Sequence, residues 1–180
     1  MPLYATRTWN GRNEGRPRAP HDPLRGLLLA GATVLIVLLF LAGAAAAQDF
    51  KTYAKKASFD DVKFDLTNAI TNKGLVVDSN GNVGGMLART GKDVGSAKTV
   101  YKNAEYFVFC SAKLSREMME ANPANAGFCP FVIFAYESAA KPGEVVVGYR
   151  RFPAAGNAAS KKALAAVDAL LDGIVKEATK

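Results

Sequence analysis

Apolar residues recur every three or four positions in two segments, 58–72 and 158–178, and this spacing predicts two helices that each bury one face. Ser58 followed by Asp61 is typical of a helix start, and Gly74 supplies the left-handed residue that often ends a helix. The apolar positions of the first helix are Phe59, Val62, Leu66, Ala69 and Ile70. Those of the second helix are Leu164, Val167, Leu170, Leu171, Ile174 and Val175.

Shorter apolar and aromatic runs, bounded by turn-forming residues, predict the strands. We expect strands over 50–56, 75–77, 105–110, 131–137 and 144–151, short helices over 83–94 and 113–121, and a turn over 78–82. The strand over 105–110 is apolar enough that we expect both of its faces to be covered. Hairpins mixed with long helices indicate an α+β domain, in which helices cover one face of a mostly antiparallel sheet.

The segment 26–47 contains no charged residue and follows a basic, proline-rich leader over 1–25, which we expect to be disordered. Small residues at Ala45 and Ala47 form a signal-peptidase site with cleavage before Gln48. The alternative is an uncleaved membrane anchor, because the run is long enough to span a bilayer. Both interpretations place a single domain, residues 48–180, outside the cytoplasm, as a periplasmic or secreted protein. The leader composition is typical of a bacterium.

The only histidine, His21, lies in the leader, so the predicted domain has none. This excludes Ser-His-Asp and Cys-His nucleophile pairs and histidine-ligated zinc or haem. Asp60, Asp61 and Asp65 lie at the predicted start of a helix, where acidic residues stabilise the helix dipole. The net charge is +7, but no basic run is interleaved with aromatic residues, so we expect no nucleic-acid partner. We predict no cofactor and favour a non-enzymatic protein.

Several motifs resemble the domain of unknown function 302 family. They are Met86-Leu-Ala-Arg-Thr-Gly-Lys-Asp-Val-Gly95, Val100-Tyr-Lys-Asn-Ala-Glu-Tyr106, Phe109-Cys-Ser-Ala112, Phe128-Cys-Pro130 and Tyr136-Glu137. The resemblance implies a TATA-binding-protein-like α+β fold, with a curved antiparallel sheet and long helices on one side. It also implies a homodimer, and Cys110 and Cys129 match the family's two cysteine positions. The family's biochemical role is not settled, and fold analogy alone supplies no function.

An even pair of cysteines in an exported domain most often forms a disulfide. If Cys110 ends one strand and Cys129 begins its antiparallel neighbour, the two lie at the same end of the sheet. The alternatives are buried free thiols, a redox-active pair, or a copper(I) site that also uses Met118 and Met119. The two methionines also fit a short helix that packs inward.

The leading functional hypothesis is an exported accessory domain that binds a small apolar ligand or a protein partner between the sheet and the helices. Gly91, Lys92 and Gly95 follow a short predicted helix and are candidates for a flexible rim around that ligand. The alternatives are a thiol-redox or copper-handling protein that uses Cys110 and Cys129, and a hydrolase that works through carboxylates or tyrosine. A membrane contact is expected only through 26–47, if that segment is not cleaved.

Overall fold

The computed structural model describes residues 49–180, so the predicted leader, the apolar segment and the cleavage site at Ala45, Ala47 and Gln48 lie outside the described residues. The elements in chain order are β1 (Phe50–Lys55), α2 (Phe59–Asn72), β2 (Val77–Asn82), α3 (Val83–Thr90), β3 (Tyr101–Phe109), α4 (Ala112–Ala121), the short 3-10 helix η1 (Pro123–Phe128), β4 (Phe131–Ser138), β5 (Val145–Arg150) and α5 (Ala158–Ala178). Among residues 49–180, no helix has the length and apolar character needed to cross a membrane.

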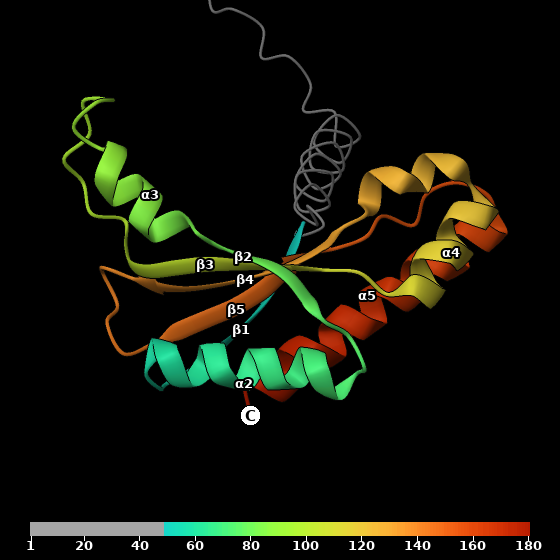
Figure 1. The fold of residues 1–180 in the computed structure, drawn as a ribbon, viewed down its shortest axis with the longest axis horizontal. Helices are drawn as coiled ribbons and strands as arrows, with labels where there is room; N and C mark the ends of the chain where they lie inside the picture. Colours follow the sequence, from blue (N-terminus) through green and yellow to red (C-terminus); the bar gives the residue numbers. More distant parts are fainter. Residues whose placement is uncertain (1–48) are drawn as a thin grey trace, which may run out of the picture. The chain divides into compact units, whose positions relative to one another are not determined.

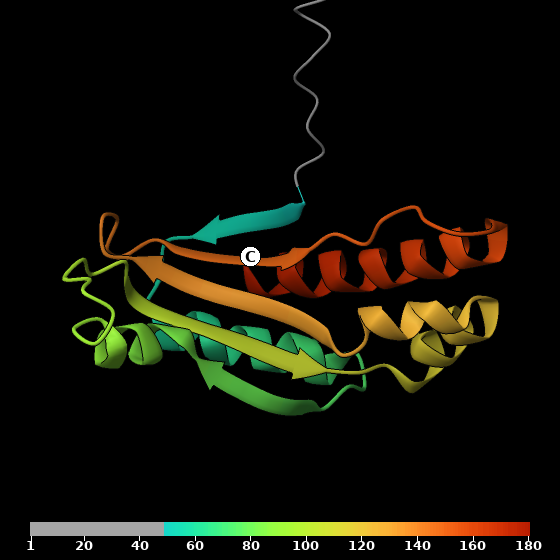
Figure 2. The ribbon, with the colours of Figure 1, turned by 90° about the horizontal axis from the view of Figure 1, so that it is seen from above.

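The five strands form one antiparallel sheet in the order β1-β5-β4-β3-β2 (Figure 1). The sheet is open, with β1 and β2 at its two edges. Helices α2 and α5 lie side by side against one face of the sheet, and α4 packs beside α5 beyond the end of the strands (Figure 2). The structure is therefore the α+β fold that the alternation of hairpins and helices predicts.

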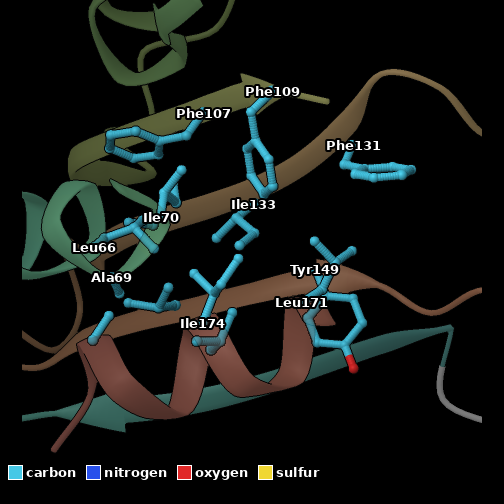
Figure 3. Packing of buried hydrophobic residues seen from close by; sticks show 14 of the residues in the cluster. Leu66, Ala69, Ile70, Phe107, Phe109, Phe131, Ile133, Tyr149, Leu171 and Ile174 are labelled. Carbon is cyan, nitrogen blue, oxygen red and sulfur yellow. The ribbon is translucent and has the colours of Figure 1, made fainter. Parts of the chain in front are cut away.

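The hydrophobic core lies between the sheet and the helices α2 and α5. Leu66 and Ile70 of α2 and Leu171 and Ile174 of α5 point toward the strands, where they meet residues such as Ile133 (Figure 3). These side chains are fully buried, and burial of each large apolar side chain contributes about 1.5–3 kcal/mol. Alternate residues of each central strand supply the other half of the core, as the period of two along a strand requires.

The ends of α2 form as the sequence predicts. The Ser58 hydroxyl oxygen accepts a hydrogen bond from the Asp61 backbone N–H at 3.1 Å, which satisfies one of the free donors of the first turn. The same hydroxyl donates to the Asp61 carboxylate at 2.6 Å. Past the other end, Gly74 has a φ of +71°, a conformation that glycine adopts without steric cost.

Two predictions about the segment 77–94 are wrong. The residues 78–82, predicted as a turn, belong to β2, and the predicted helix over 83–94 ends at Thr90. Pairing with β3 supplies hydrogen-bond partners to this Asn- and Gly-rich stretch, and Asn80 adds a side-chain bond to the backbone carbonyl of Tyr106. A tertiary contact therefore overrides the local turn preference, as is common for strands.

The expectation that both faces of the strand over 105–110 are covered is also wrong among residues 49–180. Helix α3 lies on the opposite side of the sheet from α2 and α5, against the start of β3 (Figure 1). No other described element covers that side, and Tyr106 and Val132 remain 39% and 40% exposed there. We call this side the open face; its large side chains are Phe50, Tyr101, Tyr106, Val132, Phe134 and Tyr136.

Candidate functional site

Aromatic rings follow one another across the open face. The ring of Phe50 on β1 meets Phe134 on β4 edge-on, with centroids 5.9 Å apart. Phe134 stacks on Tyr136 at 6.2 Å, and Tyr136 contacts Tyr101 of β3 at 5.4 Å. Rings at these separations attract one another beyond their apolar contact. The row therefore presents a pre-arranged apolar surface to whatever lies on this face.

Two glycines make room for the rings. One cross-strand row runs Thr52, Gly148, Phe134, Tyr106 and Gly81, each paired with the next in the antiparallel register. A Cβ atom on Gly148 would lie 2.8 Å from Cζ of Phe134, and one on Gly81 would overlap the ring of Tyr106. A glycine inside a strand is unfavourable by itself, so its presence here marks a close approach by another group.

Large rings beside small residues leave a hollow of about 420 Å³ on the open face. This volume falls within the range of small-molecule sites, which are concave and mostly apolar. The one charged residue in its lining, Glu105, is paired with the core residue Ala135 and directs its carboxylate to the helix side of the sheet, where it lies 2.7 Å from the Lys63 ammonium group of α2. The lining residues are Phe50, Thr52, Val83, Tyr101, Ala104, Glu105, Tyr106, Phe134, Ala135 and Tyr136.

A second hollow, of about 640 Å³, lies at the end of β5 and the start of β4. Its lining combines apolar residues with two arginines, Arg150 and Arg151, and one acid, Asp49. The apolar lining residues are Phe128, Pro130, Val132, Phe152, Pro153 and Ala154.

The two cysteines lie together at one end of the sheet. Cys110 follows β3 and Cys129 precedes β4, and because these strands are antiparallel their sulfur atoms lie 3.0 Å apart. Both are free thiols in the structure, since a disulfide would need a separation of about 2.05 Å. The Ser115 hydroxyl lies 3.7 Å from the Cys129 sulfur. The sequence-based prediction of a disulfide stays a prediction, in a geometry that brings the two sulfurs into contact.

The environment of Cys110 disfavours its thiolate form. Burial, followed by the hydrogen bond and charge interaction with Cys129, raises the pKa of the Cys110 thiol to about 11. A reactive catalytic cysteine has its pKa lowered instead, by a helix N-terminus or a neighbouring cation. At neutral pH the Cys110 sulfur is therefore a thiol and a poor nucleophile.

The other sequence-predicted site residues are Met118, Met119, Gly91, Lys92 and Gly95. Met118 is fully buried in the hydrophobic core, and Met119 packs partly buried against it, so both fit the inward-packing interpretation. Gly91, Lys92 and Gly95 follow α3 and do not line the hollow of the open face. Within residues 49–180, no group of three or more His, Cys, Asp or Glu side chains is placed to hold a metal ion.

Other groups with shifted pKa values serve the fold. Burial opposes ionisation of Asp172, but hydrogen bonds from Lys176, Lys51 and Tyr53 outweigh it and lower its pKa to about 2. Hydrogen bonds from the Gly143 backbone, the Asn103 amide and Lys102 lower the pKa of Glu137, which anchors the β4–β5 loop. These carboxylates lie on the helix side of the sheet or at its end, away from the aromatic row.

Sequence reasoning missed the open face, although a signal was present. Phe134 and Tyr136 alternate with Ile133 and Ala135, so β4 carries large apolar residues on both of its faces. Gly148 interrupts the opposite strand next to them. The sequence shows that both faces are apolar, but it does not show that only one of them receives helices.

Comparison with known proteins agrees with this fold. The crystal structure of an uncharacterized conserved protein DUF302 from Bacillus stearothermophilus superposes with a TM-score of 0.62 at 14% sequence identity. The superposition covers 74% of this chain and 100% of that chain. No curated protein matches the chain. Residues 50–178 match the family described as Domain of unknown function DUF302, and this stretch includes every described helix and strand. The chain therefore belongs to the DUF302 family, as its cysteine and glycine motifs predict.

Proposed function

We propose that this protein is an exported, non-enzymatic binding protein that holds a small apolar molecule on the open face of its sheet. The observation that supports the proposal is the hollow of about 420 Å³ lined by five aromatic rings. A recessed apolar site of this size suits a small molecule better than a protein partner, whose interface is wider and flatter.

We propose the open face as the ligand site because side chains fill the space between the sheet and the helices. Phe107, Ile133, Val147 and Leu171 lie between the sheet and the helices and are at most 2% exposed. Protein interiors of this kind are close-packed, and an added ligand would have to displace core side chains. The first expectation, a ligand between the sheet and the helices, is therefore replaced by a ligand on the opposite side.

A thiol-redox or copper(I)-binding role for Cys110 and Cys129 is the second candidate, supported by their 3.0 Å sulfur separation. The raised pKa of Cys110 weighs against redox catalysis. The burial of Met118 among core side chains weighs against its use as a copper ligand. We therefore rank this candidate below the binding role.

The test uses the neutral fluorescent dye Nile red as the apolar probe. The wild-type protein should bind it, and Phe134→Ala should bind at least about tenfold more weakly, because a buried aromatic ring contributes about 1.5–3 kcal/mol. The matched control is Phe64→Ala, which removes a ring that is 67% exposed on α2, away from the open face. Thermal unfolding checks that both variants fold.

Three results would contradict the proposal. They are no dye binding by the wild type, a loss of dye affinity in Phe64→Ala as large as that in Phe134→Ala, and unchanged dye binding by Phe134→Ala. Light scattering distinguishes a further occupant, a second copy of the chain. If the wild-type protein binds no dye but forms a dimer, and Phe134→Ala dissociates that dimer, the open face is a self-association surface instead.

A further inference from the structure

We propose that the ligand of the open face is an amphipathic organic anion, whose apolar chain lies along the aromatic row and whose acidic head lies in the second hollow, which Arg150 and Arg151 line. This inference rests on the proposed function and names the class of molecule that the site takes. It depends on the position of the second hollow, of about 640 Å³, relative to the first.

The two hollows adjoin along the same face of the sheet. Phe50 lines the aromatic hollow and is the register partner of Arg150, which lines the other. Side chains of partners in an antiparallel pair lie on the same face, about 4.5–5.5 Å apart at Cβ. On β4, Val132 lines the second hollow, and Phe134, two residues along on the same face, lines the first. One ligand can therefore extend from one hollow into the other.

The charges at the second hollow favour an anion. Arg150 and Arg151 are exposed and form no ion pair with any side chain of residues 49–180. Asp49 is the one acidic residue that lines the hollow, so its lining includes two cationic residues and one acidic residue. Arginine holds a carboxylate or phosphate through two parallel hydrogen bonds, which suits recognition of an acidic head.

The lining of the aromatic hollow indicates that the rest of the ligand is apolar. From Val132 to Tyr136 the strand β4 advances by about 14 Å, at roughly 3.4 Å for each residue. Glu105 is the one charged residue in the lining of this hollow, and its carboxylate pairs with Lys63 of α2 at 2.7 Å on the helix side of the sheet. A second anion would find no cation there, so the ligand has one acidic end and one apolar end.

The experiment compares two probes of equal chain length, dodecanoate and the uncharged dodecanol, by calorimetry with the purified protein below their aggregation concentrations. Dodecanoate should bind at least about tenfold more tightly than dodecanol, because hydrogen bonds to charged groups are worth more than neutral ones. The double variant Arg150→Ala/Arg151→Ala should bind dodecanoate only as tightly as dodecanol and should bind dodecanol as the wild type does.

The matched control is Lys92→Ala/Lys98→Ala, which removes the same charge from exposed residues in the loop before β3, at the opposite end of β4 from Arg150. It should leave dodecanoate binding unchanged. If the double arginine variant does not fold, the single changes Arg150→Gln and Arg151→Gln replace it, and each should weaken dodecanoate alone.

The outcomes separate this inference from the proposed function. Equal binding of the two probes, or equal loss in the lysine control, overturns the inference and leaves the apolar site standing. Absence of binding by both probes overturns the proposed function as well. Binding to vesicles of anionic phosphatidylglycerol without binding of dodecanoate overturns the inference in favour of a membrane-docking surface.

Discussion

At the scale of single residues, the most informative group is the Cys110 thiol. Its sulfur lies 3.0 Å from that of Cys129, close enough for the two to exchange a hydrogen bond. Burial and this neighbour both disfavour the thiolate, because a buried charge loses its hydration and the second sulfur would become a like charge. Cys110 therefore differs from the nucleophile of a catalytic dithiol, which is a stabilised thiolate.

This difference predicts the pH dependence of alkylation. In the reduced Cys129→Ser variant, which isolates Cys110, iodoacetamide should react slowly at pH 7.5, and its rate should still rise between pH 8 and 10. An ordinary thiol with a pKa of about 8.5 levels off in that range. Mass spectrometry gives the rate, and free glutathione is the reference. Because Cys129→Ser removes one of the causes of the raised pKa of Cys110, the apparent pKa of Cys110 in this variant should lie between about 8.5 and 11. Rapid reaction at pH 7.5 would favour the redox candidate.

At the scale of elements, the edge strand β1 is attached to α5 through one carboxylate. Asp172 of α5 accepts hydrogen bonds from the Tyr53 hydroxyl at 2.7 Å and pairs with the Lys51 ammonium group at 2.8 Å, both on β1. Lys176, one turn further along α5, pairs with it at 2.8 Å. The three contacts outweigh the cost of burial and lower the pKa of Asp172 to about 2.

Removing this carboxylate should loosen β1 and change the response to acid. Asp172→Asn should lower the free energy of unfolding at pH 7 by about 2 kcal/mol, measured by urea unfolding. Because the pKa is lowered on folding, the stabilisation is complete above about pH 4 and is lost as the pH falls toward 2. The stability curves of the two proteins should therefore converge near pH 2.

The control for this prediction is Asp93→Asn, which changes an exposed carboxylate in the loop after α3 that has no ion pair among the described residues. It should leave the pH dependence of unfolding unchanged. A constant gap between wild type and Asp172→Asn from pH 7 to pH 2 would contradict the assigned role.

At the scale of the whole molecule, the sheet topology brings together cysteines that are 19 positions apart in the chain. The segment between them includes α4 and η1, and α4 packs against α5. A covalent link between the sulfurs would close this segment into a loop. The loop would restrict the conformations of the unfolded chain and so stabilise the folded state relative to the unfolded state.

Oxidation should therefore raise the stability of the whole domain. For a closed loop of about 20 residues the chain-entropy estimate is about 3 kcal/mol, which corresponds to an increase in Tm of roughly 10 °C. Differential scanning calorimetry before and after oxidation measures the change, and Cys110→Ser should show none. A Tm that falls on oxidation would show that the fold accommodates free thiols better than a disulfide.

The sequence determined the elements that depend on local pattern. The apolar period of α5, the Ser58 cap of α2 and the left-handed Gly74 are read directly from neighbouring residues, and the structure contains each of them. The family also follows from short motifs, which now match over residues 50–178. The absence of histidine from residues 49–180 likewise needs no coordinates, because it is read from the sequence alone.

Only the tertiary structure decided which apolar face is covered. Alternation along β4 marks both faces as apolar, but the packing of α2 and α5 on one side leaves Phe134 and Tyr136 on the other. The conversion of the segment 78–82 from a turn to a strand has the same origin, since its partner β3 lies about 25 residues further along the chain. Long-range contacts of this kind carry no local signal, and the candidate site is built almost entirely from them.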